Sequence, residues 1–159
     1  GDAHSKEDIK NLVKGCNAVI NTVGHFENCE GFYSNITNNI IDIMKDFNIN
    51  RYISIASGAL RIDSDERGFF HNVIAKFMYS KYGMKMADKE KALSLLKKSE
   101  LNWSVYRLPK VIENQGIKKI KIDYNVMKGY KISNRTIAEF LIDQIDNEEH
   151  FGKLPFIWE

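Results

Sequence analysis

Three short runs along the chain are rich in apolar and β-branched residues and end at turn-forming residues, which is typical of strands. They cover residues 18–23, 52–57 and 103–108. Apolar residues recur at helical spacing over 36–47, between the first two runs, and over 92–96, before the third. Strands that alternate with helices pair in parallel, and helices cover both faces of such a sheet. The pattern therefore predicts a parallel sheet in which the run 18–23 is buried on both sides.

Shorter elements are predicted around this sheet. Ser5 and Asp8 have the spacing of a capping box at the start of a short helix. Residues 117–124 alternate lysine and isoleucine, as in a half-buried strand near a sheet edge, where lysine discourages further pairing. Ser133 is placed to cap the last helix, and 154–158 predict a terminal strand.

Length and composition indicate an ordinary globular protein. The 159 residues fit one domain with a sizeable core, so residues 1–159 are predicted to form a single domain. Hydrophobic residues make up 43% of the chain and charged residues 28%, and the net charge is +2. This balance gives no reason to expect binding to nucleic acid or to a membrane.

The two cysteines and the lack of a long apolar run bear on the compartment. Cys16 and Cys29 are too few for a disulfide framework, and their spacing to histidine predicts no metal site. No apolar run is long enough to span a bilayer, and no signal peptide is recognisable. We therefore expect a cytoplasmic protein in a reducing environment.

A glycine-rich phosphate loop is the feature that this pattern lacks. A nucleotide-binding sheet of this kind opens with a strand, a glycine-rich turn and a helix that holds the phosphates. No G-x-G-x-x-G cluster occurs in the sequence. The predicted fold is therefore α/β: a Rossmann-like, three-layer fold with a mostly parallel sheet that lacks its first strands, as in the back half of a dinucleotide-binding domain.

Several short motifs, in order along most of the chain, resemble those of a known family. They are Gly1-Asp2, Gly15-Cys16-Asn17-Ala18-Val19-Ile20, Asn38-Asn39-Ile40-Ile41-Asp42, Ser99-Glu100-Leu101-Asn102-Trp103 and Ile132-Ser133. The chain resembles the atypical short-chain dehydrogenase/reductase group with NAD(P)-binding, NmrA-like domains. Within that group it looks most similar to the flavin reductase/biliverdin reductase B type.

The resemblance implies a particular place for these residues in the fold. The family's strand order is 3-2-1-4-5-6, and strands 1 to 3 would precede Gly1. The cofactor would be NADP or NAD, and the residues that choose between them would lie before Gly1. The run 18–23 would then have an unpaired edge. We expect that edge to be covered by a second copy, giving a homo-oligomer, by another polypeptide segment, or by local rearrangement of the chain.

The candidate site follows from the strand ends, since ligands of open parallel sheets bind beyond the carboxyl ends of the strands. By resemblance, Asp2 would lie near the adenine, and Ser57 would bond the nicotinamide or a substrate carbonyl. Gly24 and Ser57 also fit plain turn roles. The expected cofactor-binding residues are Asp2, Thr22, Val23, Gly24, Ser57, Pro109, Lys110 and Val111.

The catalytic candidates are Ser57 and Lys89. The family commonly uses Tyr-x-x-x-Lys, in which the tyrosine donates a proton and the lysine lowers its pKa. Lys89 falls at the lysine position, but Lys85 occupies the tyrosine position. The missing tyrosine argues against acid-catalysed carbonyl reduction and fits direct hydride transfer to a conjugated substrate. Lys89 also fits a solvated lysine in a basic helix.

Three functions stay open at this point. The first is an NAD(P)H-dependent oxidoreductase of flavin, biliverdin or quinone-like small molecules, inactive without its N-terminal half. The second is a non-catalytic, NAD(P)-sensing regulator of the NmrA-like kind. The third is a truncated protein that binds no cofactor, because helix N-termini rarely hold a dinucleotide without the glycine turn.

Overall fold

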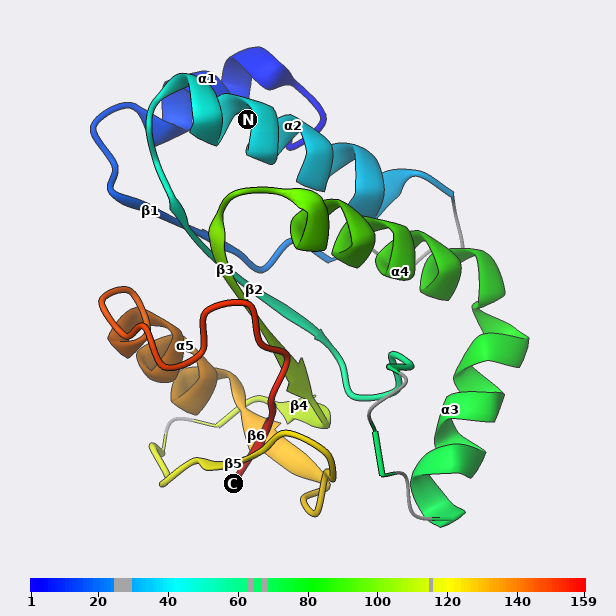
Figure 1. Cartoon of the computed structure of the whole chain (residues 1–159). Coiled ribbons are helices and arrows are strands. Elements are labelled where there is room, and N and C mark those ends of the chain that lie inside the picture. Colours follow the sequence, from blue (N-terminus) through cyan, green and yellow to red (C-terminus); the bar gives the residue numbers. More distant parts are fainter. Residues whose placement is uncertain (25–29, 63–64, 67–68, 115) are drawn as a thin grey trace.

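The computed structural model describes residues 1–24, 30–62, 65–66, 69–114 and 116–159; Cys29 lies outside them. Strands and helices alternate over most of the chain, as Figure 1 shows. In chain order the elements are α1 (Lys6–Val13), β1 (Ala18–Asn21), α2 (Phe32–Asp46), β2 (Arg51–Ser57), α3 (Phe69–Lys81), α4 (Gly83–Lys98), β3 (Asn102–Leu108), β4 (Lys110–Ile112), β5 (Lys121–Asp123), β6 (Lys131–Ser133), α5 (Asn134–Asp143) and β7 (Phe156–Trp158).

The main sheet has five strands in the order β1-β2-β3-β7-β5. β1, β2, β3 and β7 run parallel, and β5 pairs antiparallel with β7. The parallel register places Val19 beside Tyr52 and Ile53 beside Ser104. The predicted mostly parallel α/β sheet is confirmed, as is the edge position of the lysine-rich strand. Only Lys121–Asp123 of the expected 117–124 is strand.

A second, two-stranded parallel sheet pairs β4 with β6. Sequence reasoning ended the third strand run at Pro109 and predicted nothing here. Each of these strands has three residues, which is too short to reveal a period of two. The small sheet continues the chain beyond Pro109 and lies next to the carboxyl end of β3 (Figure 1).

Helices cover the two faces of the sheet unequally. On one face, buried residues of α1, α2 and α4 form a single apolar core with alternate residues of β2 and β3. On the other face, α5 covers Ile53, Tyr106 and Ile157, from β2, β3 and β7. That second core contains no residue of β1, and Ile20 is 36% exposed. The expectation that the run 18–23 is buried on both sides is therefore wrong for Ile20 within the described residues.

Both predicted N-cap serines are confirmed, but the capping box predicted for Ser5 and Asp8 is only half formed. The Ser5 N–H donates to the Asp2 carbonyl at 3.0 Å, and the Asp8 carboxylate accepts from the Asp2 N–H instead. The Ser5 hydroxyl accepts a hydrogen bond from the Asp8 N–H at 3.2 Å, and the Ser133 hydroxyl accepts one from the Thr136 N–H at 3.1 Å. Each cap satisfies an N–H that has no partner within its own helix. Over the described residues, none of the helices has the length and apolar character needed to cross a membrane.

A buried ion pair fixes the loop that follows β2. Arg107 Nη1 donates to Asp65 Oδ1 at 2.6 Å, and both side chains are 1% exposed. The same guanidinium donates to the carbonyl of Leu154 at 2.8 Å and lies 3.6 Å from the centre of the Phe156 ring. The loop is thereby tied to β3 and β7 at the carboxyl end of the sheet, where a ligand of a parallel sheet is expected.

Candidate functional site

The carboxyl ends of β1, β2 and β3 meet around one cavity of about 240 Å³, the strand-end cavity. Parallel strands end at the same edge of a sheet, so residues far apart in sequence converge there. Six of the eight expected cofactor-binding residues line it, together with the catalytic candidate Lys89. The lining residues are Thr22, Val23, Gly24, Tyr33, Ile55, Ala56, Ser57, Lys89, Leu108, Pro109 and Val111.

A neighbouring cavity of about 320 Å³ shares Ser57, Leu108 and Pro109 with the strand-end cavity. Lys110, expected at the cofactor, lines this neighbouring cavity instead. Successive side chains of a strand point to opposite faces, which separates Lys110 from Val111 in β4, whereas Pro109 lines both cavities. The other lining residues are Gly58, Ala59, Ile74, Met78, Met127, Gly129 and Tyr130.

Gly58 brings the two cavities close together. Its N–H donates to the Leu108 carbonyl at 2.7 Å, and a Cβ at this position would lie 2.7 Å from Met127 Cε. The end of the methionine can shift, but the same Cβ would lie 3.0 Å from the Leu108 carbonyl oxygen, so a larger residue would press against the backbone of β3.

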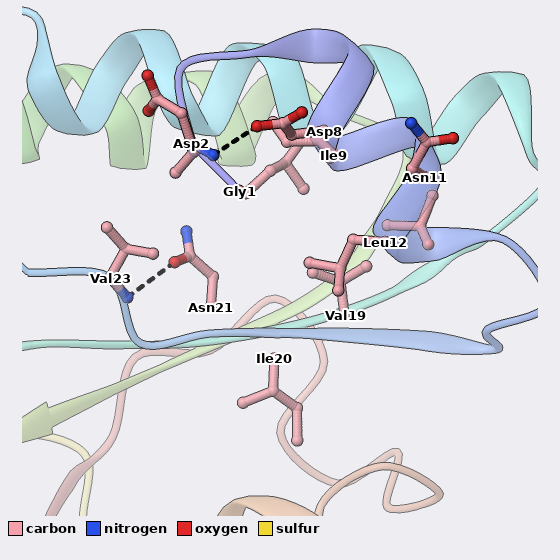
Figure 2. A pocket seen from close by; sticks show the side chains of 13 residues that line it. Gly1, Asp2, Asp8, Ile9, Asn11, Leu12, Val19, Ile20, Asn21 and Val23 are labelled. Carbon is pink, nitrogen blue, oxygen red and sulfur yellow. Dashed lines mark hydrogen bonds between the residues drawn. The ribbon is translucent and has the colours of Figure 1, made fainter.

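Asp2 does not line the strand-end cavity, and of the other site candidates Val23 lines both that cavity and the one at Asp2. Asp2 lines a larger cavity of about 510 Å³ between α1 and β1, shown in Figure 2. Its N–H donates to Asp8 Oδ2 at 2.6 Å, and its carboxylate accepts from the His4 N–H at 2.9 Å. The structure thus gives Asp2 a local role in the turn before α1, and its expected place near an adenine stays a prediction.

The large cavity runs along the open edge of β1. In the described sheet, β1 pairs with β2 on one side and has no strand on the other. Ile9, Leu12 and Val19 lie between α1 and β1, whereas Ile20 points away from α1 (Figure 2). Leu12 is 77% exposed. This combination of unpaired backbone groups and exposed apolar side chains is what a missing neighbouring strand would leave.

Ser57 has a turn role in the free protein. Its hydroxyl accepts a hydrogen bond from the Ala59 N–H at 3.2 Å. A hydroxyl that accepts can still donate its own proton. Because Ser57 lines both cavities, that proton lies at the boundary between them.

Lys89 lies against the strand-end cavity rather than in solvent. Its ammonium is 4.7 Å from the centre of the Tyr33 ring. Burial, with a smaller contribution from the charge of Lys85, lowers the pKa of Lys89 to about 8. Within the described part of the chain no carboxylate pairs with it. A desolvated cation of this kind suits an anionic or carbonyl oxygen in the cavity.

Tyr33 is the cavity residue that sequence reasoning missed. The family pattern places the tyrosine four residues before the lysine in the same helix, whereas Tyr33 lies in the first turn of α2. Only the packing of α2 against α4 brings the two together. Tyr79, which lies nearer in sequence, bonds Glu90 and accepts from the Arg61 N–H at 3.1 Å, and burial raises its pKa to about 12.

No group of three or more histidine, cysteine, aspartate or glutamate residues in the described ranges could hold a metal ion. The polar groups that line the strand-end cavity are hydroxyls, a lysine and backbone amides. This donor set suits an organic ligand with carbonyl and hydroxyl oxygens.

Solved structures with the same fold include several NAD(P)-related proteins. A short-chain dehydrogenase/reductase from Veillonella parvula matches with a TM-score of 0.79 and 14% identity, over 100% of this chain and 70% of that chain. A wide-type short-chain dehydrogenase/reductase from the same species, in complex with NADP, matches with a TM-score of 0.77 and 13% identity, over 100% and 70%. An anaerobillin reductase from Escherichia coli matches with a TM-score of 0.76 and 15% identity, over 100% and 73%.

These identities are low, so the structural matches establish the Rossmann-like fold. No curated protein matches the chain. A family model described as NAD(P)H-binding matches residues 1–148. The NAD(P)-binding domain recognised from the sequence is confirmed by this family model. The solved structures share its fold, and the finer assignment to the atypical short-chain dehydrogenase/reductase group stays a prediction. The chain belongs to the NAD(P)H-binding family.

Proposed function

We propose that this protein is an NAD(P)H-dependent oxidoreductase of flavin, biliverdin or quinone-type substrates, with the nicotinamide end of the cofactor in the strand-end cavity. The observation that carries the proposal is the convergence of Gly24, Ser57, Pro109 and Lys89 on that cavity. The residues fit the group: a Cβ at Gly24 would meet no atom of the described residues within 4 Å, so among these residues nothing blocks the backbone from a ligand. Ser57 and Lys89 supply donors for carboxamide and ribose oxygens.

The chain's own residues have distinct roles in this proposal. Bound NAD(P)H supplies a hydride. The backbone at 22–24 and 109–111 would hold the nicotinamide end against the strand ends. The Ser57 hydroxyl would donate a hydrogen bond to a ligand oxygen at the boundary of the two cavities. Lys89 presents a cation that has no carboxylate partner among the described residues. The neighbouring cavity, with Met78 and Met127 in its wall, would hold an apolar substrate.

The open edge of β1 is covered in the working protein, and the handedness of the fold favours a particular occupant. α1 and α2 lie on the same face of the sheet. Right-handed connections on one face all advance in the same direction across a sheet. Since α2 leads from β1 to β2, a connection through α1 into β1 starts from a strand on the open side. We therefore propose that a parallel strand preceding α1 in the polypeptide occupies the edge.

A second copy is the competing occupant of this edge. Pairing of two β1 edges would give hydrogen-bond partners to the unpaired backbone groups of β1. It would leave Ile20 exposed, since α5 covers β2, β3 and β7 of the main sheet but not β1. A preceding segment that supplies the strand and also a helix on the face of Ile20 would cover both. Light scattering of residues 1–159 from about 1 to 100 µM should therefore detect a monomer. A stable dimer that Ile20→Lys dissociates would assign the edge to a second copy.

The cofactor site is tested with reduced nicotinamide mononucleotide, which carries the nicotinamide end without the adenine. In amide NMR spectra of residues 1–159, the expected shifts are at Gly24, Ser57 and Lys89, with saturable binding that Lys89→Met weakens. Lys97→Met is the matched control, on an exposed part of the same helix. Shifts confined to the large cavity at Asp2, or none at all, would contradict the proposal.

Turnover requires the covered edge in this proposal, because the phosphate loop is absent from residues 1–159. Protein that carries the additional strand should oxidise NADPH or NADH with flavin mononucleotide, biliverdin or menadione as acceptor. Equal rates with the two cofactors would leave no preference between NADP and NAD. Exposed Cys16, a free thiol, fits the cytoplasmic location that we also propose.

A non-catalytic NAD(P)-sensing regulator is the second candidate. It is favoured by Lys85, which stands where the family's proton-donating tyrosine would be. Cofactor binding by the covered protein without oxidation of NADPH or NADH across the acceptor panel would select it. Failure of both reduced nicotinamide mononucleotide and NADPH to bind would select a protein without cofactor binding.

A further inference from the structure

The first turn of α2 is capped by a residue from another helix. The N-cap position of α2 is Gly31, which has φ of 81° and no side chain to bond the free N–H groups. Asp88 of α4 replaces the missing cap: its Oδ2 accepts from the Tyr33 N–H at 2.6 Å and from the Ser34 N–H at 3.4 Å. Its Oδ1 accepts from the Ser34 hydroxyl at 2.5 Å. Asp88 is 3% exposed.

The residues joined by this carboxylate border the strand-end cavity. The Tyr33 N–H donates the shorter of the two backbone hydrogen bonds to Asp88, and Lys89 directly follows Asp88 in the chain. Both Tyr33 and Lys89 line the cavity, with the Lys89 ammonium over the Tyr33 ring. One buried group therefore sets the separation of the two helices at the point where they wall the site.

We propose that Asp88 is a positioning residue, which clamps α2 to α4 and so holds Tyr33 and Lys89 stacked on the wall of the strand-end cavity. The inference rests on the proposed function for its consequence in catalysis, but the clamp itself is a property of the free protein. The stack presents a desolvated cation to an oxygen of the nicotinamide end or of the substrate.

The consequence of removing the clamp follows from the hydrogen bonds. Asp88→Ala leaves two N–H groups at the start of α2 without their acceptor, and these must turn to water. The first turn of α2 then separates from α4, and the Tyr33 ring no longer shields Lys89. Burial is the largest cause of the lowered pKa of Lys89, and Lys85 the other. Hydration should therefore raise that pKa from about 8 toward the ordinary value of 10.5.

The first experiment uses the free protein. The ¹³Cε resonances of labelled lysine are followed against pH, with Lys89 assigned by its absence in Lys89→Arg. We expect Lys89 of the wild type to titrate near 8 and Lys89 of Asp88→Ala to titrate closer to 10.5. Asp46→Ala, an exposed carboxylate at the far end of α2, should leave Lys89 unchanged.

Asp88→Asn keeps the test decisive if Asp88→Ala does not fold. Its amide oxygen can still accept from the Tyr33 N–H, while its amide nitrogen cannot accept from Ser34. Lys89 of this variant should titrate between the wild-type and ordinary values. Folded Asp88 variants, verified by circular dichroism, in which Lys89 titrates as in the wild type would overturn the proposal.

The second experiment measures binding of reduced nicotinamide mononucleotide. Asp88→Ala should weaken it about tenfold, and Ser34→Ala, which removes only the hydroxyl bond to Oδ1, by a smaller factor. Unchanged binding in both variants, with Lys89 displaced, would contradict the role at the cavity. If the wild type itself does not bind, the proposed function fails, whereas the lysine titration still decides whether the clamp exists.

Discussion

The two faces of the sheet differ in how far they are completed by residues 1–159. The face with α1, α2 and α4 is covered from β1 to β3, whereas the face with α5 is covered only from β2 onward. Ile20 and Ile53, neighbours in register on β1 and β2, show the difference: they are 36% and 0% exposed. Helices thus cover β2 and β3 on both faces of the sheet, but they cover β1 on one face only. The uncovered part of the sheet is the outer face of this edge strand.

The largest expected loss of stability comes from breaking the buried ion pair at the carboxyl end of the sheet. Asp65→Ala breaks the buried ion pair with Arg107. Because this leaves a buried guanidinium without its carboxylate, the free energy of unfolding should fall by about 3–5 kcal/mol. Urea denaturation measures it. Asp42→Ala removes the exposed ion pair with Lys6 and should cost below about 1 kcal/mol. Equal losses in the two variants would contradict the assigned role.

The register pair Ile20 and Ile53 tests the comparison directly. Ile53→Ala creates a cavity under α5 and should cost about 2–5 kcal/mol in denaturant unfolding. Ile20→Ala in residues 1–159 should cost below about 1 kcal/mol, as at a surface position. In protein that carries the additional strand and a helix over the face of Ile20, the cost of Ile20→Ala should approach that of Ile53→Ala. A large cost at Ile20 without that strand would mean that its face is already covered.

The two helix caps give a smaller contrast between the regions. Ser133→Ala removes the cap of α5 together with the bonds of its hydroxyl to Thr136 Oγ1 and the Gly116 carbonyl. Thermal unfolding should show a loss near the upper end of the roughly 0.5–2 kcal/mol range for caps. Ser5→Ala, which removes one partly buried bond on α1, should lie near its lower end. The reverse order would indicate that α1 is packed more firmly than α5.

The last contrast is a pH dependence from Lys89. Its pKa in the folded protein is about 8, below the ordinary 10.5. Between these values the unfolded chain binds more protons, so this group makes the folded state more stable as pH rises. Lys89→Met should remove that increase in urea denaturation measured from pH 7.5 to 9.5. Lys97→Met, which lies in solvent, should keep it. Parallel pH profiles for the wild type and Lys89→Met would contradict the buried position of the lysine.

Most of the fold could be predicted from local sequence patterns. The strand runs, both helix caps and the convergence of Thr22, Ser57 and Pro109 depend on periods and on the fact that parallel strands end together. The strand β1 is shorter than predicted, ending at Asn21. The aromatic-rich stretch 69–82 shows no period in the sequence and is helical through Lys81.

The rest depends on contacts between distant residues. Asp88 has the appearance of an ordinary polar residue in a lysine-rich helix, and only the missing cap of α2, 54 residues away at Ser34, explains its burial. Tyr33 carries no spacing signal toward Lys89. Lys110 faces the neighbouring cavity because β4 pairs with β6. These strands are too short for a local sequence pattern to predict their pairing. These are the parts of the site that determine its chemistry.

The edge of the sheet opposite β1 limits the addition of further strands. β5 ends the sheet as a three-residue antiparallel strand, with Lys121 exposed at its start. Short, charged edge strands discourage further pairing. The sheet therefore has one receptive end and one blunt end, so two copies that met through their β1 edges would present only their β5 edges to further chains. Association through this edge yields a closed unit and does not propagate into fibres.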